Sequence, residues 1–425
     1  ILHYAARHHI RVIPEIDIPG HSRAAIKAMN ARYARYISTD PDRAREYLLT
    51  DSCDTSVYRS AQEYTDNVMN IAMPSAYRFV RKVFGELHRM YEKAGVELSV
   101  VHIGGDEVPR GAWSGSPICR EFMARNGLVD THALKDHFVR WLYGELNAKG
   151  IRLAGWQEIV MLPDGRHVNR ELPGRRILSY GWNTQLGEGF DEVPYALANA
   201  GYPVILCNVT NLYLDLAYNK HHMEPGHRWG GYVDARSTFD MLPYDIYRSV
   251  RTHPNGSPVD LASASSGKEA LSPDARRNIV GIQGQLWAET IRNFGMAEYL
   301  LFPKMCGLSE RAWNASPAWG TDPDGSGYRQ ALRRYNARIA SVEMPRLAAL
   351  GVNFRVSPPG LKLQDGMLRA NSAEPGATIR YTLDGSEPTE ASARWTAPVA
   401  CKTSGVKARA YYCGRASVTS ELSND

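Results

Sequence analysis

Short apolar runs rich in β-branched residues alternate with amphipathic stretches along most of this 425-residue chain. This alternation predicts βα units around a parallel sheet, whose strands are covered on both faces and therefore lack a polar side. The predicted strands are residues 11–17, 98–104, 152–156, 176–180, 203–208 and 279–285. Residues 77–91 and 134–146 have apolar side chains at helical spacing, and each stretch is followed by a glycine suited to end a helix.

The fold class that we expect is α/β, a TIM (β/α)8 barrel that lacks its first two strands in this chain. The chain opens at Ile1 without a start methionine, apparently inside a helix. We therefore expect the two remaining strands in an N-terminal segment of the same protein. Residues 296–313 and 328–350 are the predicted closing helices, the second of them bent at Pro345.

The composition changes near residues 357–360, which read Ser-Pro-Pro-Gly. Beyond them, short runs at 378–383 and 406–412 alternate with turns, a pattern typical of a small immunoglobulin-like β-sandwich. We predict a catalytic barrel domain at residues 1–352 and a C-terminal all-β domain at residues 353–425. Residues 31–75 show no strand pattern and are predicted to be an insertion that shapes the active site.

Charge and composition disfavour several kinds of partner. The net charge of +5 comes from 50 basic and 45 acidic residues spread along the chain, so nucleic acid is not an expected partner. No apolar run approaches the roughly 20 residues of a membrane-spanning helix. None of the 6 cysteines forms a CxxC pair, which disfavours a zinc knuckle. Cys401 and Cys413 flank a predicted hairpin and would be able to pair in an oxidising compartment.

The strongest chemical signal is Val-His-Ile-Gly-Gly-Asp-Glu at residues 101–107. Catalytic residues of barrel enzymes lie at the C-terminal ends of strands, where Asp106 and Glu107 are predicted to lie. Two adjacent carboxyl groups in a confined site do not both ionise easily, so we expect a raised pKa for one of them. A carboxyl with a raised pKa suits a general acid that protonates a glycosidic oxygen. The alternative is an ordinary turn with two solvated acids.

A second predicted strand also ends in polar residues, in Pro-Glu-Ile-Asp-Ile-Pro-Gly-His at residues 14–21. His21 is positioned to hydrogen-bond a catalytic carboxylate and to tune its ionisation. The alternative is that Asp17 and His21 only stabilise a loop.

Three tryptophans, Trp156, Trp182 and Trp287, each close a different predicted strand. A single tryptophan more often belongs to a core, but three at equivalent strand ends favour a sugar-binding surface. Two further pairs have the i, i+2 spacing that points both side chains the same way from extended backbone, namely Trp287 with Glu289 and Tyr213 with Asp215.

The phrases PEIDIPGH, HIGGDE, GWQE, NLYLD and QLWAE resemble, in the same order, the motifs of glycoside hydrolase family 20, the β-N-acetylhexosaminidases. The C-terminal part is similar to the sandwich of bacterial chitobiase-like members. The resemblance implies an exo-acting, retaining enzyme that removes terminal β-linked N-acetylglucosamine or N-acetylgalactosamine through an oxazolinium intermediate. It implies no metal and no organic cofactor. The expected partners are oligosaccharides or glycoconjugates that end in N-acetylhexosamine, and such substrates favour a secreted or periplasmic location.

The resemblance also implies a role for each motif residue. Glu107 would be the general acid and base, Asp106 would orient the 2-acetamido group, and Tyr213 would donate its hydroxyl to the acetamide oxygen. His21 would support the acid. The implied substrate-binding residues are Trp156, Trp182, Asp215, Trp229, Trp287 and Glu289. The family also has an arginine on its first strand and an aspartate after its second, both expected in the upstream segment.

Two alternative functions stay open, a lacto-N-biosidase of the same family and a non-catalytic glycan-binding protein. A metal-dependent hydrolase using His21, His102 and Asp106 is less favoured, because His102 should point into the strand layer. An endo-acting chitinase is disfavoured because the chain has no DxxDxDxE run.

Overall fold

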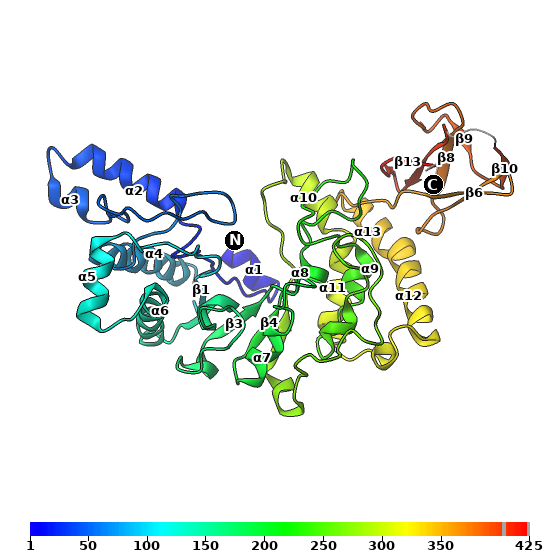
Figure 1. The fold of residues 1–425 in the computed structure, drawn as a ribbon. Helices are drawn as coiled ribbons and strands as arrows, with labels where there is room; N and C mark the ends of the chain where they lie inside the picture. The colour runs from blue at the N-terminus through cyan, green and yellow to red at the C-terminus, as the bar shows by residue number, and fades with distance from the viewer. Residues whose placement is uncertain (402–404, 423–425) are drawn as a thin grey trace. The chain divides into compact units, whose positions relative to one another are not determined.

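The computed structural model describes residues 1–401 and 405–422 (Figure 1). The chain divides into two compact units, which are described separately below. The first unit consists of Ile1–Trp182, Glu192–Leu206 and Leu271–Val280. The second unit consists of Asn183–Asp191, Cys207–Ala270 and Gly281–Asp425.

A five-stranded sheet with the order β1-β2-β3-β4-β5 organises the first unit. Its strands are β1 (Val100–His102), β2 (Arg152–Trp156), β3 (Leu178–Gly181), β4 (Val204–Leu206) and β5 (Ile279–Ile282). β1 to β4 pair in parallel and are almost entirely buried, as their apolar sequences require. Five of the six predicted strands are therefore confirmed.

The prediction of a strand at residues 11–17 is wrong. This segment makes a single parallel bridge to β1, between Glu15 and His102. The Ile16 N–H donates to the His102 carbonyl and the His102 N–H to the Pro14 carbonyl, each at 3.0 Å. Pro14 has no N–H, so the ladder cannot extend beyond this bridge toward the start of β1.

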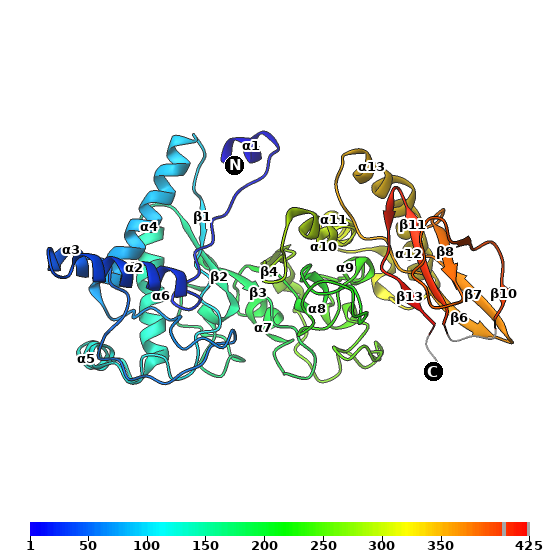
Figure 2. The same ribbon diagram turned by 90° about the horizontal axis from the view of Figure 1, so that it is seen from above.

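The first unit also contains helices. They are α1 (Leu2–Arg7), α2 (Arg23–Tyr36), α3 (Pro41–Arg45), α4 (Pro74–Lys93), α5 (Pro117–Asn126), α6 (Thr131–Asn147) and α7 (Val193–Asn199), with 3-10 turns η1 (Gln157–Val160), η2 (Gly174–Arg176) and η4 (Pro273–Asn278). Figure 2 shows α4 beside α6, where the Tyr77 ring lies 5.7 Å from Phe138 and 4.5 Å from Trp141. The helices predicted at 77–91 and 134–146 are confirmed. Every residue from 31 to 75 is described and none is in a strand, as predicted.

The second unit carries the remaining helices. They are α8 (Val209–Leu212), α9 (Ala235–Phe239), α10 (Phe294–Leu301), α11 (Lys304–Trp313), α12 (Ser326–Arg338) and α13 (Met344–Ala349), with η3 (Ile246–Ser249), η5 (Ala318–Thr321) and the π-helical η6 (Ile339–Glu343). Among the described helices, none is both long and apolar enough to cross a bilayer.

The first of the two predicted closing helices is interrupted. It is divided into α10 and α11 at Phe302 and Pro303, since a proline cannot continue the hydrogen-bond pattern of the preceding turn. The second is helical from Ser326 to Ala349, with the π-helical turn η6 between α12 and α13 just before the expected bend. Pro345 itself lies in the first turn of α13, directly after η6, and has no N–H to donate to that preceding turn.

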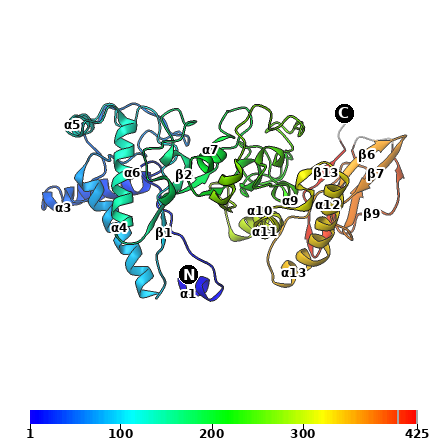
Figure 3. The same ribbon diagram turned by 90° about the horizontal axis from the view of Figure 1, so that it is seen from below.

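Two antiparallel sheets form the C-terminal sandwich. One sheet contains β6 (Gly360–Gln364), β7 (Met367–Asn371) and β10 (Val399–Ala400), and the other contains β8 (Thr378–Thr382), β9 (Ala393–Arg394), β11 (Lys407–Tyr412), β12 (Arg415–Ala416) and β13 (Ser420–Glu421). Figure 3 shows β6 and β7 side by side. The predicted runs at 378–383 and 406–412 correspond to β8 and β11, so the all-β prediction is confirmed.

The predicted pairing of Cys401 with Cys413 is wrong. Cys413 has a free thiol and packs against the apolar cluster around Phe354. Cys401 belongs to another cluster, with Leu368 and Val406. The two side chains face different cores, so flanking the same stretch of chain does not bring them together.

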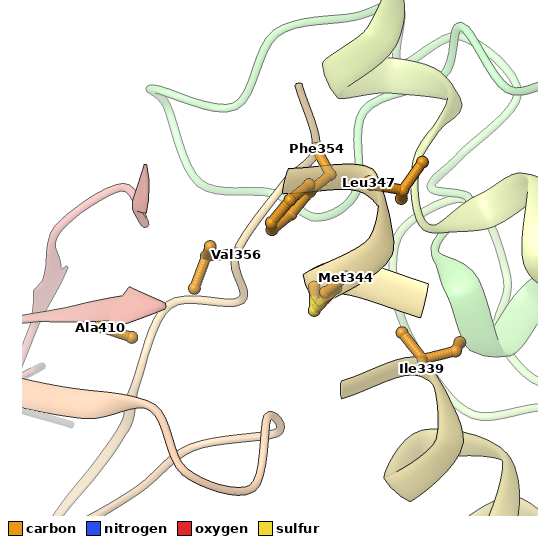
Figure 4. Close-up of a cluster of buried hydrophobic side chains, with 6 residues drawn as sticks. All are labelled: Ile339, Met344, Leu347, Phe354, Val356 and Ala410. Atoms are coloured by element: carbon orange, nitrogen blue, oxygen red, sulfur yellow. The ribbon is translucent and has the colours of Figure 1, made fainter. Parts of the chain in front are cut away.

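A buried apolar cluster joins α13, the segment that follows it, and β11 (Figure 4). Its residues are Ile339, Met344, Leu347, Phe354, Val356 and Ala410. Phe354 has the largest side chain of this cluster and is 2% exposed. The cluster therefore anchors the first sandwich residues to the last helix.

We expect Phe354→Ala to destabilise the second unit by about 3–5 kcal/mol, because it removes buried surface and leaves a cavity. Thermal unfolding followed by near-ultraviolet circular dichroism would show this as a lower Tm. The control is Leu350→Ala, at a side chain of the same region that is 65% exposed. Equal Tm values for the two variants would contradict the role assigned to the cluster.

Candidate active site

The residues that follow β1 form the centre of the first unit's site. His21 Nε2 lies 3.3 Å from Asp106 Oδ2 and 3.4 Å from Glu107 Oε2. Both His21 and Glu107 have positive φ angles, 46° and 50°, a backbone region that side-chain-bearing residues rarely adopt. The structure therefore brings together three of the residues predicted to be catalytic, although they come from two segments about eighty positions apart.

Two glycines allow this approach. Gly104 and Gly105 have φ angles of +65° and +88°. A Cβ atom on Gly104 would lie 1.9 Å from Asp17 Oδ1, and one on Gly105 would lie 2.1 Å from Ile159 Cγ2. The Gly105 N–H donates to Asp17 Oδ1 at 3.2 Å, so Asp17 holds the turn that precedes the acids.

We expect Gly104→Ala to reduce both stability and activity, since its methyl group would displace Asp17. The left-handed backbone alone costs an alanine about 1–2 kcal/mol. Gly150→Ala is the matched control, because Gly150 has a φ of +71° but no atom within 4 Å of a new Cβ. A Tm for Gly104→Ala that is no lower than that of Gly150→Ala would contradict the tight packing.

The charges around His21 are unusual. The hydrogen bonds that the His21 ring donates to Asp106 and Glu107 raise its pKa to about 11, despite burial, so the ring is protonated at neutral pH. Burial and the nearby Asp106 raise the pKa of Asp17 to about 9, so this carboxyl is neutral. The pKa of Glu107 is held below its usual range, because hydrogen bonds from His21 and Gln62 outweigh its burial. The expectation of a raised pKa is therefore wrong for Glu107, and raised pKa values are found instead for Asp17 and Glu158.

A residue of the 31–75 insertion reaches Glu107. Gln62 Nε2 donates a hydrogen bond to Glu107 Oε2 at 2.9 Å. The sequence predicted that the insertion shapes the active site, but no local pattern distinguishes Gln62 from its neighbours. Its partner lies 45 positions along the chain.

The two tryptophans of the first unit are both held by carboxylates. Trp156 Nε1 donates to Glu15 Oε1 at 3.0 Å, and Trp182 Nε1 donates to Glu158 Oε1 at 3.0 Å. Neither acid was predicted to have a role. Beside Glu107 and Glu158 lies a cavity of about 510 Å³.

His102 lies in the strand layer, as expected. It is 2% exposed, and its ring contacts Trp156 and Tyr180 at centroid distances of 5.0 and 4.5 Å. Among the described residues, the group close enough to hold a metal ion is Asp17, His21 and Asp106, without His102. A protonated His21 and a neutral Asp17 are poor metal ligands, because ligands must lose their protons to bind. The metal-site combination considered from the sequence is therefore not formed.

The second unit contains another group of predicted site residues. A parallel bridge joins Tyr213 to Gln285, and the Leu214 N–H donates to the Gln285 carbonyl at 2.7 Å. This pairing aligns the two motif segments. The Tyr213 ring lies 5.8 Å from Trp229 and 6.4 Å from Trp287. The three rings therefore form one aromatic cluster within this unit.

The two predicted hydroxyl acceptors have different surroundings. Asp215 is fully buried, and burial raises its pKa to about 6, against the effect of backbone N–H groups and of His227. Lys304 Nζ donates to the carbonyls of Leu214 and Leu216, each at 2.7 Å, on either side of this aspartate. The side chain of Glu289 is 58% exposed and lies 3.7 Å from His227 Nε2. Asp215 is thus buried beside backbone carbonyls that Lys304 binds, whereas Glu289 is open to solvent.

Comparison with known families decides the relationship. The profile of the glycosyl hydrolase family 20 catalytic domain matches residues 1–316. The chain belongs to this family. The chitobiase/β-hexosaminidase C-terminal domain matches residues 343–417, which contain most of the sandwich.

This family 20 chain is similar to several known proteins in sequence and in structure. A β-hexosaminidase of Vibrio vulnificus is 31% identical over an alignment of 411 residues, which covers 91% of this chain and 47% of that protein. The N,N'-diacetylchitobiase of Vibrio harveyi is 30% identical, with the same coverage of 91% and 47%. The crystal structure of a family 20 exo-β-N-acetylglucosaminidase from Vibrio harveyi, in complex with N-acetylglucosamine, superposes with a TM-score of 0.60 at 29% identity and covers 83% of this chain and 45% of that chain. The chain spans about half the length of these relatives.

Proposed function

We propose that this family 20 protein is an exo-acting, retaining β-N-acetylhexosaminidase that hydrolyses terminal β-linked N-acetylglucosamine or N-acetylgalactosamine. The observation that carries the proposal is the contact of His21 with both Asp106 and Glu107 at the end of β1. Two indoles of the same unit are held by acids of neighbouring segments. The names of the relatives at about 30% identity support the same activity.

The proposal gives a role in the same reaction to the motif residues of each unit. The sheet would be part of a (β/α)8 barrel at residues 1–352, with its motif residues at the C-terminal ends of the strands. The sandwich at residues 353–425 would be an accessory domain, of which 402–404 and 423–425 lie outside the described residues. A secreted or periplasmic location is part of the proposal, because the expected substrates are oligosaccharides or glycoconjugates that end in N-acetylhexosamine.

The mechanism follows from the adjacency of the two acids. A retaining glycosidase with an enzyme nucleophile places its carboxylates on opposite sides of the anomeric carbon, about 5–5.5 Å apart. Neighbours in sequence that share His21 do not straddle a sugar in this way. Family 20 enzymes are instead among the substrate-assisted exceptions, in which the 2-acetamido oxygen attacks the anomeric carbon.

The proposed hydrolysis has two steps, and together they retain the configuration of the anomeric carbon. Glu107 donates a proton to the leaving oxygen while the acetamide oxygen displaces it and forms a cyclic oxazolinium ion. Asp106 stabilises the charge on the acetamide nitrogen, and the Tyr213 hydroxyl donates to the acetamide oxygen. Glu107 then takes a proton from water, whose oxygen opens the ring on the face that the leaving group occupied. The chain's own residues perform each step without a metal or an organic cofactor.

Glu107 is ionised in the resting site and must gain a proton before it can act. We propose that this proton comes from solvent when a bound leaving group displaces Gln62, because a His21 ring with a pKa of about 11 is too weak an acid to supply it. Desolvation by the substrate would then favour the neutral acid.

This proposal predicts a pH shift for Gln62→Ala. Gln62 stabilises the charged form of Glu107, so its removal should raise the pKa of that acid. The limb of the kcat/KM profile that reports loss of the acid's proton should move to higher pH. Gln185→Ala, in the second unit, is the control. An unchanged profile would contradict the role of Gln62.

A chromogenic assay tests the function itself. We expect p-nitrophenyl N-acetyl-β-glucosaminide or its galactosaminide to release the monosaccharide, first as the β-anomer by proton NMR. Binding of N-acetylglucosamine without turnover would support the glycan-binding alternative. Release of a disaccharide from an aryl lacto-N-bioside, without monosaccharide release, would support the lacto-N-biosidase alternative.

A further inference from the structure

Two residues that follow β2 hold the tryptophan that follows β3. The Trp182 backbone N–H donates to Gln157 Oε1 at 3.0 Å. Its indole N–H faces both oxygens of Glu158, at 3.0 and 3.2 Å. The neighbouring register, with Trp156 opposite Tyr180, places the two strand ends side by side. Gln157 and Glu158, which follow Trp156 in the GWQE motif, therefore hold Trp182 in place.

Glu158 is itself held in place. Its backbone carbonyl accepts a hydrogen bond from Lys135 Nζ of α6 at 2.7 Å. Glu158 lies in η1, which begins directly after β2. Glu158 also lines the cavity beside Glu107. Its backbone is thus bound to α6, while its carboxyl contacts the Trp182 indole beside the site of the predicted chemistry.

The charge state of Glu158 fits a contact with an indole. Burial and the nearby Asp106 raise the pKa of Glu158 to about 8, although Trp182 and Lys135 oppose the rise. The neutral acid still accepts from the indole N–H through its carbonyl oxygen. In this form it adds no second negative charge beside Asp106. Lys135 interacts electrostatically with Asp136 as well as with Glu158.

Aromatic walls discriminate sugars only when their planes are fixed before binding, because ordering a ring on binding reduces affinity. Two anchors, one on the backbone and one on the indole nitrogen, determine the position and the rotation of Trp182. Trp156 is held similarly, through its indole N–H and Glu15, at 3.0 Å. Because two tryptophans of this unit each donate an indole N–H to a glutamate, we infer that this pairing is a specific feature of the site.

We propose that Glu158 is a positioning residue that fixes the indole plane of Trp182 for recognition of the N-acetylated sugar. The inference rests on the proposed function, in which Trp182 is a wall of the sugar site. It adds a residue that acts through Trp182 and not on the sugar.

The test compares Glu158→Gln with Glu158→Leu. The amide oxygen of glutamine can accept the same hydrogen bond, so this variant should keep kcat/KM at pH 6 within about threefold of the unsubstituted protein. Leucine accepts no hydrogen bond and should lower kcat/KM by about 10–100-fold, the usual effect of removing an orienting partner. Most of the loss should appear in KM, and calorimetry should show weaker binding of N-acetylglucosamine. Glu121→Leu, at an exposed side chain of α5, is the matched control.

The pH profile provides a readout that a purely structural role would not change. Ionised Glu158 still accepts from the indole but adds a negative charge beside Asp106, so we expect an alkaline decline in kcat/KM near pH 8 that Glu158→Gln, which cannot ionise, should lose. A loss of more than about tenfold in kcat/KM at pH 6 for a folded Glu158→Gln would overturn the proposal even if Glu158→Leu fails to fold. Unchanged KM and sugar binding in a folded Glu158→Leu would also overturn it.

The experiments distinguish a failure of the proposed function from a failure of the role proposed for Glu158. If the unsubstituted protein neither hydrolyses the chromogenic substrate nor binds N-acetylglucosamine, both proposals fail. If it does both and Glu158→Leu matches it, only the role of Glu158 fails.

Discussion

Glu107→Gln is expected to lower kcat/KM by about 10²–10⁴-fold on a substrate with a poor leaving group, such as a disaccharide. The carboxamide has nearly the same shape as the acid, but it cannot give a proton to the departing oxygen. An aryl glycoside with a strongly acidic phenol needs no such proton and should lose much less in the first step. Rates across a series of substituted phenols should therefore depend more steeply on the phenol's pKa in the variant.

The second step offers an independent check of Glu107. Water needs a base to open the oxazolinium ring, whereas azide is a nucleophile without a proton to lose. Azide should therefore restore turnover of activated substrates by Glu107→Gln and form the β-glycosyl azide. Glu171→Gln is a suitable control, because that side chain is 86% exposed. The same loss for every leaving group, with no effect of azide, would contradict the assignment of the acid and base.

Replacement of the substrate's 2-acetamido group by a hydroxyl should have an even larger effect on turnover. An intramolecular nucleophile is worth an effective concentration of about 10⁵–10⁸ M, and a glucoside has no such group. We expect kcat for the aryl glucoside to fall by several orders of magnitude relative to the aryl N-acetylglucosaminide. Inhibition of the normal reaction by the glucoside would establish that it still binds.

The same comparison identifies the partner of the acetamide. Asp106→Asn should slow the N-acetylglucosaminide strongly, because the uncharged side chain no longer stabilises the developing positive charge. It should change the residual glucoside rate little. Comparable turnover of the two substrates would contradict substrate assistance, whatever the variant does.

The parts of the fold with a strong repeating pattern could be predicted from the sequence. Residues 152–156 were predicted as a strand and are β2, and the predicted helix at 77–91 lies within α4. The failures lie where one residue overrides the pattern. Pro14 prevents residues 11–17 from forming a strand ladder, and Pro303 divides an apolar stretch that otherwise has helical spacing. In each case the hydrophobic pattern is intact, and the missing backbone N–H decides the outcome.

The site was predictable where chemistry is local and unpredictable where it depends on neighbours in space. Asp106 and Glu107 follow a strand with two glycines, a signal that is complete within one segment. The acceptors of the two indoles are not local, since Glu15 lies 141 positions from Trp156 and Glu158 lies 24 from Trp182. Both acids belong to the recognised motifs, but choosing their partners requires the order of the strands. The raised pKa of Asp17 likewise depends on burial that no sequence pattern reveals.

The left-handed backbone at His21 and Glu107 has a consequence for engineering this protein. Each residue holds its main chain in a region that disfavours any Cβ by about 1–2 kcal/mol. Selection for heat resistance alone would thus reward glycine at position 107, a change that relaxes the loop and deletes the acid. Mutant libraries selected for thermal stability should therefore keep positions 21 and 107 constant and vary positions outside the site. At these two positions, greater stability is expected to reduce activity.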